Sequence, residues 1–338
     1  MYQGTDATTP TATYTHTSTN KVKVNFKKGT DGEQVVIANG SETVTYNNTS
    51  EKPLKVVFHP ATDEINGHKY VEIGGIKWAT MNVGATSVAD DAATAYGDYY
   101  AWGETATYYS NISWSGSTPT FTWKDTSNDT DTHMKAGKST GYAAANYTSV
   151  SGSGVSATMS EWSPTPYSSS TNTLESDYDV AAKQWGGSWR MPTSDEFLAL
   201  YNACSDEEAS TSGKKTGKIT KSLSDTNNTI SDGGVYRIAA GITVDGTKYN
   251  VAGLLFISKT DKTKRVFFPA AGNVSGTTSK LTFTISGSTT SYGLLDYWTS
   301  SYKSSSRAYC FGNINSSDVL TADDGGRNVG HTVRPVSD

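Results

Sequence analysis

The sequence is poor in cysteine, histidine and charge. It has two cysteines, Cys204 and Cys310, far apart in the chain, and five histidines without the paired spacing of metal ligands. Charged residues make up 18% and the formal net charge is −5, which argues against a nucleic-acid partner or an anionic membrane surface. No apolar run is long enough to span a membrane. We therefore expect no metal, no cofactor, no nucleic acid and no direct membrane insertion.

The chain also lacks a complete catalytic or calcium-binding pattern. It contains no Gly-x-Ser-x-Gly motif, no phosphate-binding loop and no Cys-His arrangement. The acid pair Asp195–Glu196 fits a helix start, and the acidic run 206–208 fits a solvated helix end. Residues 128–131 and Asp323–Asp324 offer oxygens, but neither run continues into a loop with a bidentate Glu. We expect a non-enzymatic protein, with a structural calcium ion as an open alternative.

Aromatic and small residues are abundant. Eight Trp, twenty Tyr and thirty-two Gly, with many Ser, Thr and Asn, are typical of a strand- and loop-rich extracellular protein. The first four residues lead into polar sequence without an apolar signal segment, so we expect a trimmed export signal, as in a lipoprotein, or another route of exit. The expected location is extracellular or cell-surface exposed, with a phage virion tail as the alternative.

The first part of the chain predicts a small β module. Alternating apolar and polar residues indicate short strands near residues 22–26, 35–37, 44–46 and 54–58, with Gly- and Asn-rich turns between them. So few strands make only a marginal core. We therefore expect residues 1–65 to hold an N-terminal tether and a small all-β, immunoglobulin-like module that leans on its neighbour.

Two helices are predicted further along the chain. Thr193 and Glu196 form a capping box, and the apolar residues of the segment 197–204 follow with the spacing of one helical face. A shorter helix is expected to start at an Asp177 cap and to stop before Gly186, which can adopt the left-handed conformation. Both helices lie within sequence that otherwise reads as strand and loop.

Several segments after residue 65 resemble one family. They are YVEIGGIKWATMNVG (70–84), YGDYYAWGE (96–104), LESDYDVAAKQWGGSWRMPT (174–193) and FFPAAG (267–272). In this order they resemble the FISUMP family, a branch of the C-type-lectin-like fold close to formylglycine-generating enzymes. The resemblance implies an α+β class, with a C-type-lectin-like domain over residues 66–338 that has two helices, small twisted antiparallel sheets and long loops. Cys204 and Cys310 do not match the copper-binding cysteine pair of those enzymes, so the oxidase activity is not expected here.

The C-terminal region, about residues 297–336, carries a second resemblance. Tyr297–Trp298 and residues 332–336 of the closing segment 330–336 alternate as strands do, and Trp298 is expected to be buried, while the run between them is polar. This region resembles the variable repeat of proteins diversified by diversity-generating retroelements, in which errors at template adenines turn Asn codons into codons for many residue types. Residues 323–330, DDGGRNVG, fit a template with Asn codons on both sides of a fixed Arg327 and before a fixed Gly330.

This second resemblance implies a hypervariable ligand-binding face. The candidate residues are Ser306, Arg307, Cys310, Gly312, Ile314, Asp318, Leu320, Asp323, Asp324, Gly325, Gly326, Asn328 and Val329. We expect them to be solvent-exposed and clustered on one face, because exchange at such positions leaves the core intact. The expected function is recognition of a protein or glycan on another cell, host or phage surface. The alternative is a surface lipoprotein or pilus-tip adhesin that binds glycan or matrix protein without diversification.

Overall fold

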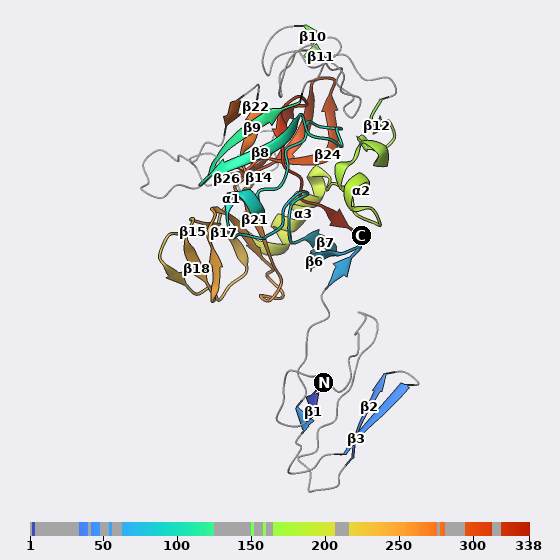
Figure 1. Ribbon diagram of the computed structural model, residues 1–338, viewed down its shortest axis with the longest axis vertical. Coiled ribbons are helices and arrows are strands. Elements are labelled where there is room, and N and C mark those ends of the chain that lie inside the picture. Colours follow the sequence, from blue (N-terminus) through green and yellow to red (C-terminus); the bar gives the residue numbers. More distant parts are fainter. Residues whose placement is uncertain are drawn as a thin grey trace. The chain divides into compact units, whose positions relative to one another are not determined.

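The computed structural model describes residues 63–124, 165–206, 216–275, 278–280, 295–312 and 319–338, together with short strands outside these ranges. The chain divides into two units, Met1–Asp63 and Glu64–Asp338, whereas the sequence suggested a division after residue 65. The described strands of the first unit form two antiparallel pairs (Figure 1): β1 (Tyr2–Gln3) with β4 (Leu54–Lys55), and β2 (Gln34–Asn39) with β3 (Glu42–Asn47). The strand expected near residues 22–26 lies outside the described residues.

The expected α+β, C-type-lectin-like fold class is wrong, because the protein is mainly β. Strand is far more abundant than helix, 42% against 12%, and it is spread over many small sheets. The described strands of the first unit form two separate pairs, and the rest of the expected immunoglobulin-like module lies outside the described residues. The helices of the described residues are α1 (Ala92–Ala95), α2 (Val180–Trp185), α3 (Ser194–Cys204) and the 3-10 helix η4 (Ser176–Tyr178).

Several segments that are rich in turn-forming and polar residues contain strands. One example is the hairpin of β8 (Tyr109–Ser115) and β9 (Thr118–Trp123), which turns at Gly116 with a φ of 61°. A second example is the polar segment that follows α3, which contains β14 (Thr216–Lys218), β15 (Lys221–Leu223) and β16 (Asn227–Asn228). A composition rich in turn residues therefore did not predict these short strands, which are stabilised by pairing with other strands.

The largest sheet of the second unit has six strands. Its order is β12 (Tyr167–Ser168), β13 (Thr173–Leu174), β24 (Tyr297–Ser304), β25 (Arg307–Phe311), β26 (Val319–Gly326) and β14. Two further sheets have four strands each. The order of the first is β15, β17 (Gly234–Ile238), β20 (Gly253–Ile257) and β21 (Arg265–Pro269). The order of the second is β28 (Val336–Ser337), β7 (Ile76–Ala79), β6 (His68–Ile73) and β5 (Glu64–Ile65). The smaller sheets are β16, β18 (Ile242–Val244), β19 (Thr247–Tyr249); β23 (Thr278–Lys280), β22 (Asn273–Ser275), β27 (Gly330–His331); and β10 (Val150–Ser151) with β11 (Thr158–Met159).

Helix α3 packs between the six-stranded sheet and the sheet that contains β17, β20 and β21 (Figure 1). The predicted capping box is confirmed: Thr193 accepts from the Glu196 amide, and the Glu196 carboxylate accepts from the Thr193 amide. The apolar side of the helix is buried, and Phe197 stacks on Phe311 of β25 with ring centroids 4.1 Å apart. With its contacts to β14, β24, β25 and β26, α3 covers part of one face of the six-stranded sheet.

Helix α2 belongs to the core on the opposite face of that sheet, together with Trp298 of β24. Its predicted stop at Gly186 is confirmed, with a φ of 64°. Its predicted cap is wrong by two residues, because the chain first makes the η4 turn and Asp179, not Asp177, accepts from the amides of Ala181 and Ala182. Trp298 is fully buried, as expected.

The last strand of the chain, β28, pairs with β7, one of the first strands of the second unit. Val336 of β28 lies opposite Trp78 of β7. Arg334 is fully buried, and its guanidinium donates to the Asn82 side chain and to the Ala79 carbonyl, both at 2.8 Å. The closing segment 330–336 is therefore part of the scaffold. Among the described residues, no helix combines the length and the apolar character needed to cross a membrane.

Candidate functional site

Strands β24, β25 and β26, here called the C-terminal sheet, place the candidate residues. Tyr309 lies opposite Asp324 in the antiparallel register of β25 and β26. Because successive residues of a strand point to opposite faces, Arg307, Tyr309 and Phe311 share one face and Ala308 belongs to the other. Helix α3 packs against Phe311 on this first face, while Arg307, Tyr309 and Asp324 stay partly exposed.

Four side chains at this open end form what we call the recognition patch: Lys303, Arg307, Tyr309 and Asp324. The Asp324 carboxylate accepts a hydrogen bond from Arg307 Nη2 at 2.8 Å and forms an ion pair with Lys303. The Lys303 Nζ lies 5.2 Å from the centroid of the Tyr309 ring. Burial alone would raise the pKa of Asp324, but the hydrogen bonds from Arg307 and Lys303 lower it to about 2. At neutral pH the patch therefore carries two positive charges, one negative charge and an aromatic ring.

The turn between β24 and β25 is held by Arg327. The Arg327 amide donates to the Ser306 carbonyl and its Nη1 donates to the Ser305 carbonyl, each at 3.0 Å. Its guanidinium is fully buried, with its central carbon 4.8 Å from the centroid of the Trp102 ring. Arg327, which the template pattern keeps fixed, is therefore a scaffold residue that positions the edge of the patch.

The candidate variable residues are divided between several environments. Arg307 and Asp324 belong to the patch, and Ser306 and Gly325 are partly exposed. The expected exposure is wrong for Cys310, Gly312, Gly326, Asn328 and Val329, which are buried. Leu320 and Asp323 lie in β26, where only the backbone is described, and Ile314 and Asp318 lie outside the described residues. The described members of the set therefore do not form a single exposed face.

Close packing explains the buried members. Gly312 has a φ of 137°, and a Cβ built there would lie 2.1 Å from the Leu295 carbonyl oxygen. After β26 the chain turns inward: the Val329 amide donates to the Gly326 carbonyl at 2.9 Å, before β27 enters the core. Neither Gly325 nor Gly326 has a positive φ. The position that needs glycine for its conformation is therefore Gly312.

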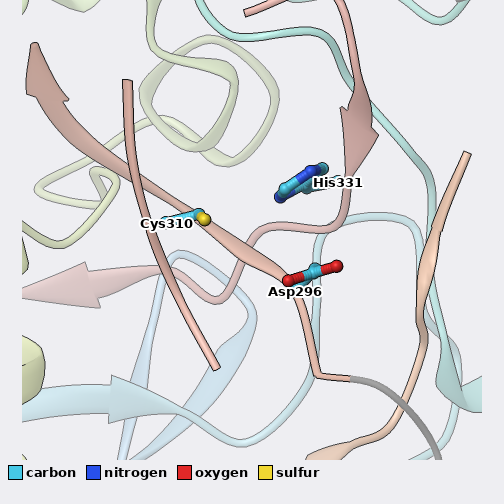
Figure 2. Close-up of side chains that lie close together, drawn as sticks. All are labelled: Asp296, Cys310 and His331. Atoms are coloured by element: carbon cyan, nitrogen blue, oxygen red, sulfur yellow. The ribbon is translucent and has the colours of Figure 1, made fainter. Parts of the chain in front are cut away.

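A second group, which sequence reasoning missed, lies on the buried face of the C-terminal sheet. Asp296, Cys310 and His331, here called the buried trio, each offer a potential metal-ligand atom, and these atoms lie within 4.8 Å of one another. Figure 2 shows the Cys310 sulfur directed toward the space between Asp296 and His331. Burial lowers the pKa of His331 to about 3, so its imidazole is neutral. The three residues come from different strand regions, so no sequence spacing indicates them.

A pocket of about 420 Å³ beside α2 is a weaker candidate. Its two charged lining residues are Asp179 and Arg190. Asp179 caps α2 and accepts from the Met191 amide at 2.7 Å, and Arg190 donates to Glu196. Both groups are committed to holding α2 and α3 in place, which favours a structural role for them.

Two features of the C-terminal sheet thus require an explanation. The recognition patch lies on the face that α3 covers only in part, and the buried trio lies on the opposite face. The patch includes Lys303 and Tyr309, which the template pattern did not single out. Strand alternation with Arg307 could have indicated Tyr309, whereas Lys303 lies in the neighbouring strand β24. Comparison of the chain with protein-family models, with curated proteins and with solved structures found no match.

Proposed function

We propose that this chain is a non-enzymatic recognition protein that binds its ligand at the recognition patch. The observation that carries the proposal is the partial cover of one sheet face: α3 packs over Phe311, while Lys303, Arg307, Tyr309 and Asp324 stay accessible beyond it. We further propose that the region around the patch was diversified by a retroelement of the kind its sequence resembles.

The division between patch and scaffold supports this proposal. Arg327, which the template pattern keeps unchanged, is fully buried, as is Trp298 at the start of the region. Arg307 and Asp324, which it allows to change, are partly exposed and pair with each other. Substitutions at surface positions usually change stability by no more than about 0.5 kcal/mol, whereas core truncations cost several times more. Specificity at the patch could therefore change while the sheet persists.

The chemistry of the patch favours a protein ligand with an acidic surface. Tyr and Arg are enriched among the residues that dominate binding energy in protein interfaces. Arg307 and Lys303 give the patch a net positive charge, since Asp324 neutralises only one of them. A standard interface covers about 800 Å² per partner, so the contact would extend from the patch over the partly exposed turn at Ser305–Ser306.

The test compares two triple variants with matched charge changes. The patch variant carries Lys303→Ser, Arg307→Ser and Asp324→Ser, and removes both partners of each ion pair together. The control variant carries Lys262→Ser, Arg265→Ser and Asp232→Ser near β21, where Lys262 pairs with Asp232 and Arg265 with Asp245. Wild type and both variants are applied to arrays of extracellular proteins and of glycans, after their melting temperatures have been compared.

We expect the control variant to keep the wild-type binding profile and the patch variant to lose it, with both variants folded. A folded patch variant with the unchanged profile would refute the proposal. A profile that consists of glycans and is lost in the patch variant would keep the binding site and reject the protein-ligand class.

Diversification has its own test at the level of the gene. We expect an imperfect second copy of the codons for residues 297–336 near the gene, beside a reverse-transcriptase gene, with differences confined to adenines of that copy. A locus without such a copy would favour the non-diversified lipoprotein or pilus-tip adhesin. The proposed binding site would stand in either case, because it does not depend on how its sequence arose.

A further inference from the structure

The buried trio has the composition of a metal site. It combines a thiol, an imidazole and a carboxyl group, all more than nine-tenths buried, with potential ligand atoms within 4.8 Å of one another. Thiolate, imidazole and carboxylate are the three ligand types that zinc uses in proteins. The Nδ1 of His331 has no hydrogen-bond partner in the described part of the chain. A buried polar atom without a partner is rare in folded proteins and calls for an explanation such as an ion.

The backbone holds all three residues on rigid elements. The amide and carbonyl of His331 both pair with Tyr100, at 3.0 and 2.9 Å. Cys310 lies within β25, opposite Trp298 of β24, and Asp296 directly precedes β24. A metal site needs ligands that are already positioned by such elements. The three potential ligand atoms, which lie within 4.8 Å of one another, need to move only slightly closer together to surround one ion in tetrahedral geometry.

The surroundings of the trio resemble the outer support of a metal site. The Asn273 side chain donates a hydrogen bond to the Asp296 carboxylate, which fixes the orientation of that group. The ring of His331 stacks on Trp298, with centroids 4.0 Å apart and planes within 10°. Both contacts restrict the two side chains.

Charge balance selects the class of ion. A thiolate and a carboxylate carry two negative charges, and a neutral imidazole adds none. A divalent cation makes this set neutral, which suits a buried location where an uncompensated charge is costly. The soft thiolate disfavours magnesium and calcium and favours zinc, which takes mixed sulfur, nitrogen and oxygen ligands in tetrahedral geometry.

We propose that Asp296, Cys310 and His331 bind one zinc ion, with a water molecule as the fourth ligand. The thiol proton passes to solvent when the ion binds. The site lies on the face opposite the recognition patch, so its role is to join β24, β25 and β27 and not to bind the ligand. It is independent of the proposed recognition function, but it requires cysteine at position 310, which is one of the candidate variable residues.

The experiment uses zinc and cobalt ions on the full chain, with Cys204→Ala as the matched control. Cys204 is also a buried cysteine, but it lies in α3 within another part of the core. Chains equilibrated with zinc and dialysed are analysed for bound metal, and their melting temperatures are compared with and without zinc. Cobalt titration of the Cys204→Ala protein then reports on Cys310 alone, through a thiolate-to-cobalt absorption band.

We expect one bound zinc per chain, a raised melting temperature and the cobalt band in both the wild type and Cys204→Ala. Cys310→Ala should lose all three responses. So should His331→Phe, which keeps a ring on Trp298 but removes the nitrogen. Asn273→Ala should bind zinc roughly 10–100-fold more weakly. Absence of zinc and of the cobalt band in Cys204→Ala would overturn the proposal, as would wild-type zinc content in His331→Phe.

Discussion

Replacing Asp324 by asparagine tests the electrostatics of the recognition patch. The side chain of Asp324 is only 13% exposed, and it is held by Arg307 and Lys303, whose side chains are 30% and 41% exposed. The asparagine would keep the shape of the side chain but lose its charge. The separate hydrogen bond from Arg307 to the backbone carbonyl of Asp324, at 2.6 Å, would remain after the substitution. The change therefore isolates the ion pairs from the backbone contact.

The magnitude follows from the pKa of Asp324. A reduction from 3.8 to about 2 corresponds at most to roughly 2.5 kcal/mol, at about 1.4 kcal/mol for each pKa unit. Both cations are partly exposed, and solvent screening reduces the worth of such pairs. We therefore expect Asp324→Asn to lower the free energy of unfolding by about 1 kcal/mol at pH 7 and low salt.

The sign of the pH dependence is fixed by the direction of the pKa shift. Because the pKa of Asp324 is lower in the folded than in the unfolded state, its stabilisation is present above about pH 4 and is lost as the pH falls toward 2. The difference between wild type and Asp324→Asn should shrink over the same interval. High salt should reduce it at pH 7, since these charges are partly exposed.

The assay is urea denaturation of both proteins at a series of pH values from 7 to 2.5. Asp232→Asn serves as the control, because Asp232 pairs with Lys262 while its own side chain is 80% exposed. This control should change the free energy of unfolding by no more than about 0.5 kcal/mol at any pH. Equal stability of wild type and Asp324→Asn at pH 7, or a difference that does not shrink in acid, would refute the reasoning.

Three further substitutions test the scaffold by chemical denaturation. Asp179→Ala should cost about 2–4 kcal/mol, since it removes the α2 cap and leaves the buried Met191 amide without its partner; a loss below about 0.5 kcal/mol would contradict this. Trp298→Ala should cost about 3–5 kcal/mol as a truncation of a fully buried side chain, and an unchanged melting temperature would place Trp298 at the surface. Gly312→Ala should destabilise by more than about 1 kcal/mol, because its Cβ would overlap the Leu295 carbonyl at a positive φ; tolerance of alanine there would show that the backbone can relax.

Local signals in the sequence predicted the features that depend on a few neighbouring residues. The capping box of Thr193 and Glu196 and the stop at Gly186 are of this kind, because both satisfy backbone groups within one turn. The α2 cap was misplaced because Asp177 and Asp179 are both good caps, and the preceding η4 turn selects between them. The fold class failed because short strands with turn-like composition acquire their hydrogen bonds from distant partners.

The candidate site shows the same division. The polar run after Trp298 indicated where the candidate residues lie, and Arg307 and Asp324 are two of the four residues of the patch. It could not indicate that Cys310, Asn328 and Val329 are buried, because their burial depends on where β26 turns back into the core.

By itself, the sequence determined the helix boundaries around α3, the buried anchor at Trp298 and the region that carries the candidate site. Each depends on side-chain pattern and local backbone chemistry, which are properties of a short segment. Only the tertiary structure decided which face of the C-terminal sheet α3 leaves open, and that Asp296, Cys310 and His331 meet. The reason is physical: strand register and packing bring together residues far apart in the chain, and a one-residue shift in register would reverse the face of every side chain.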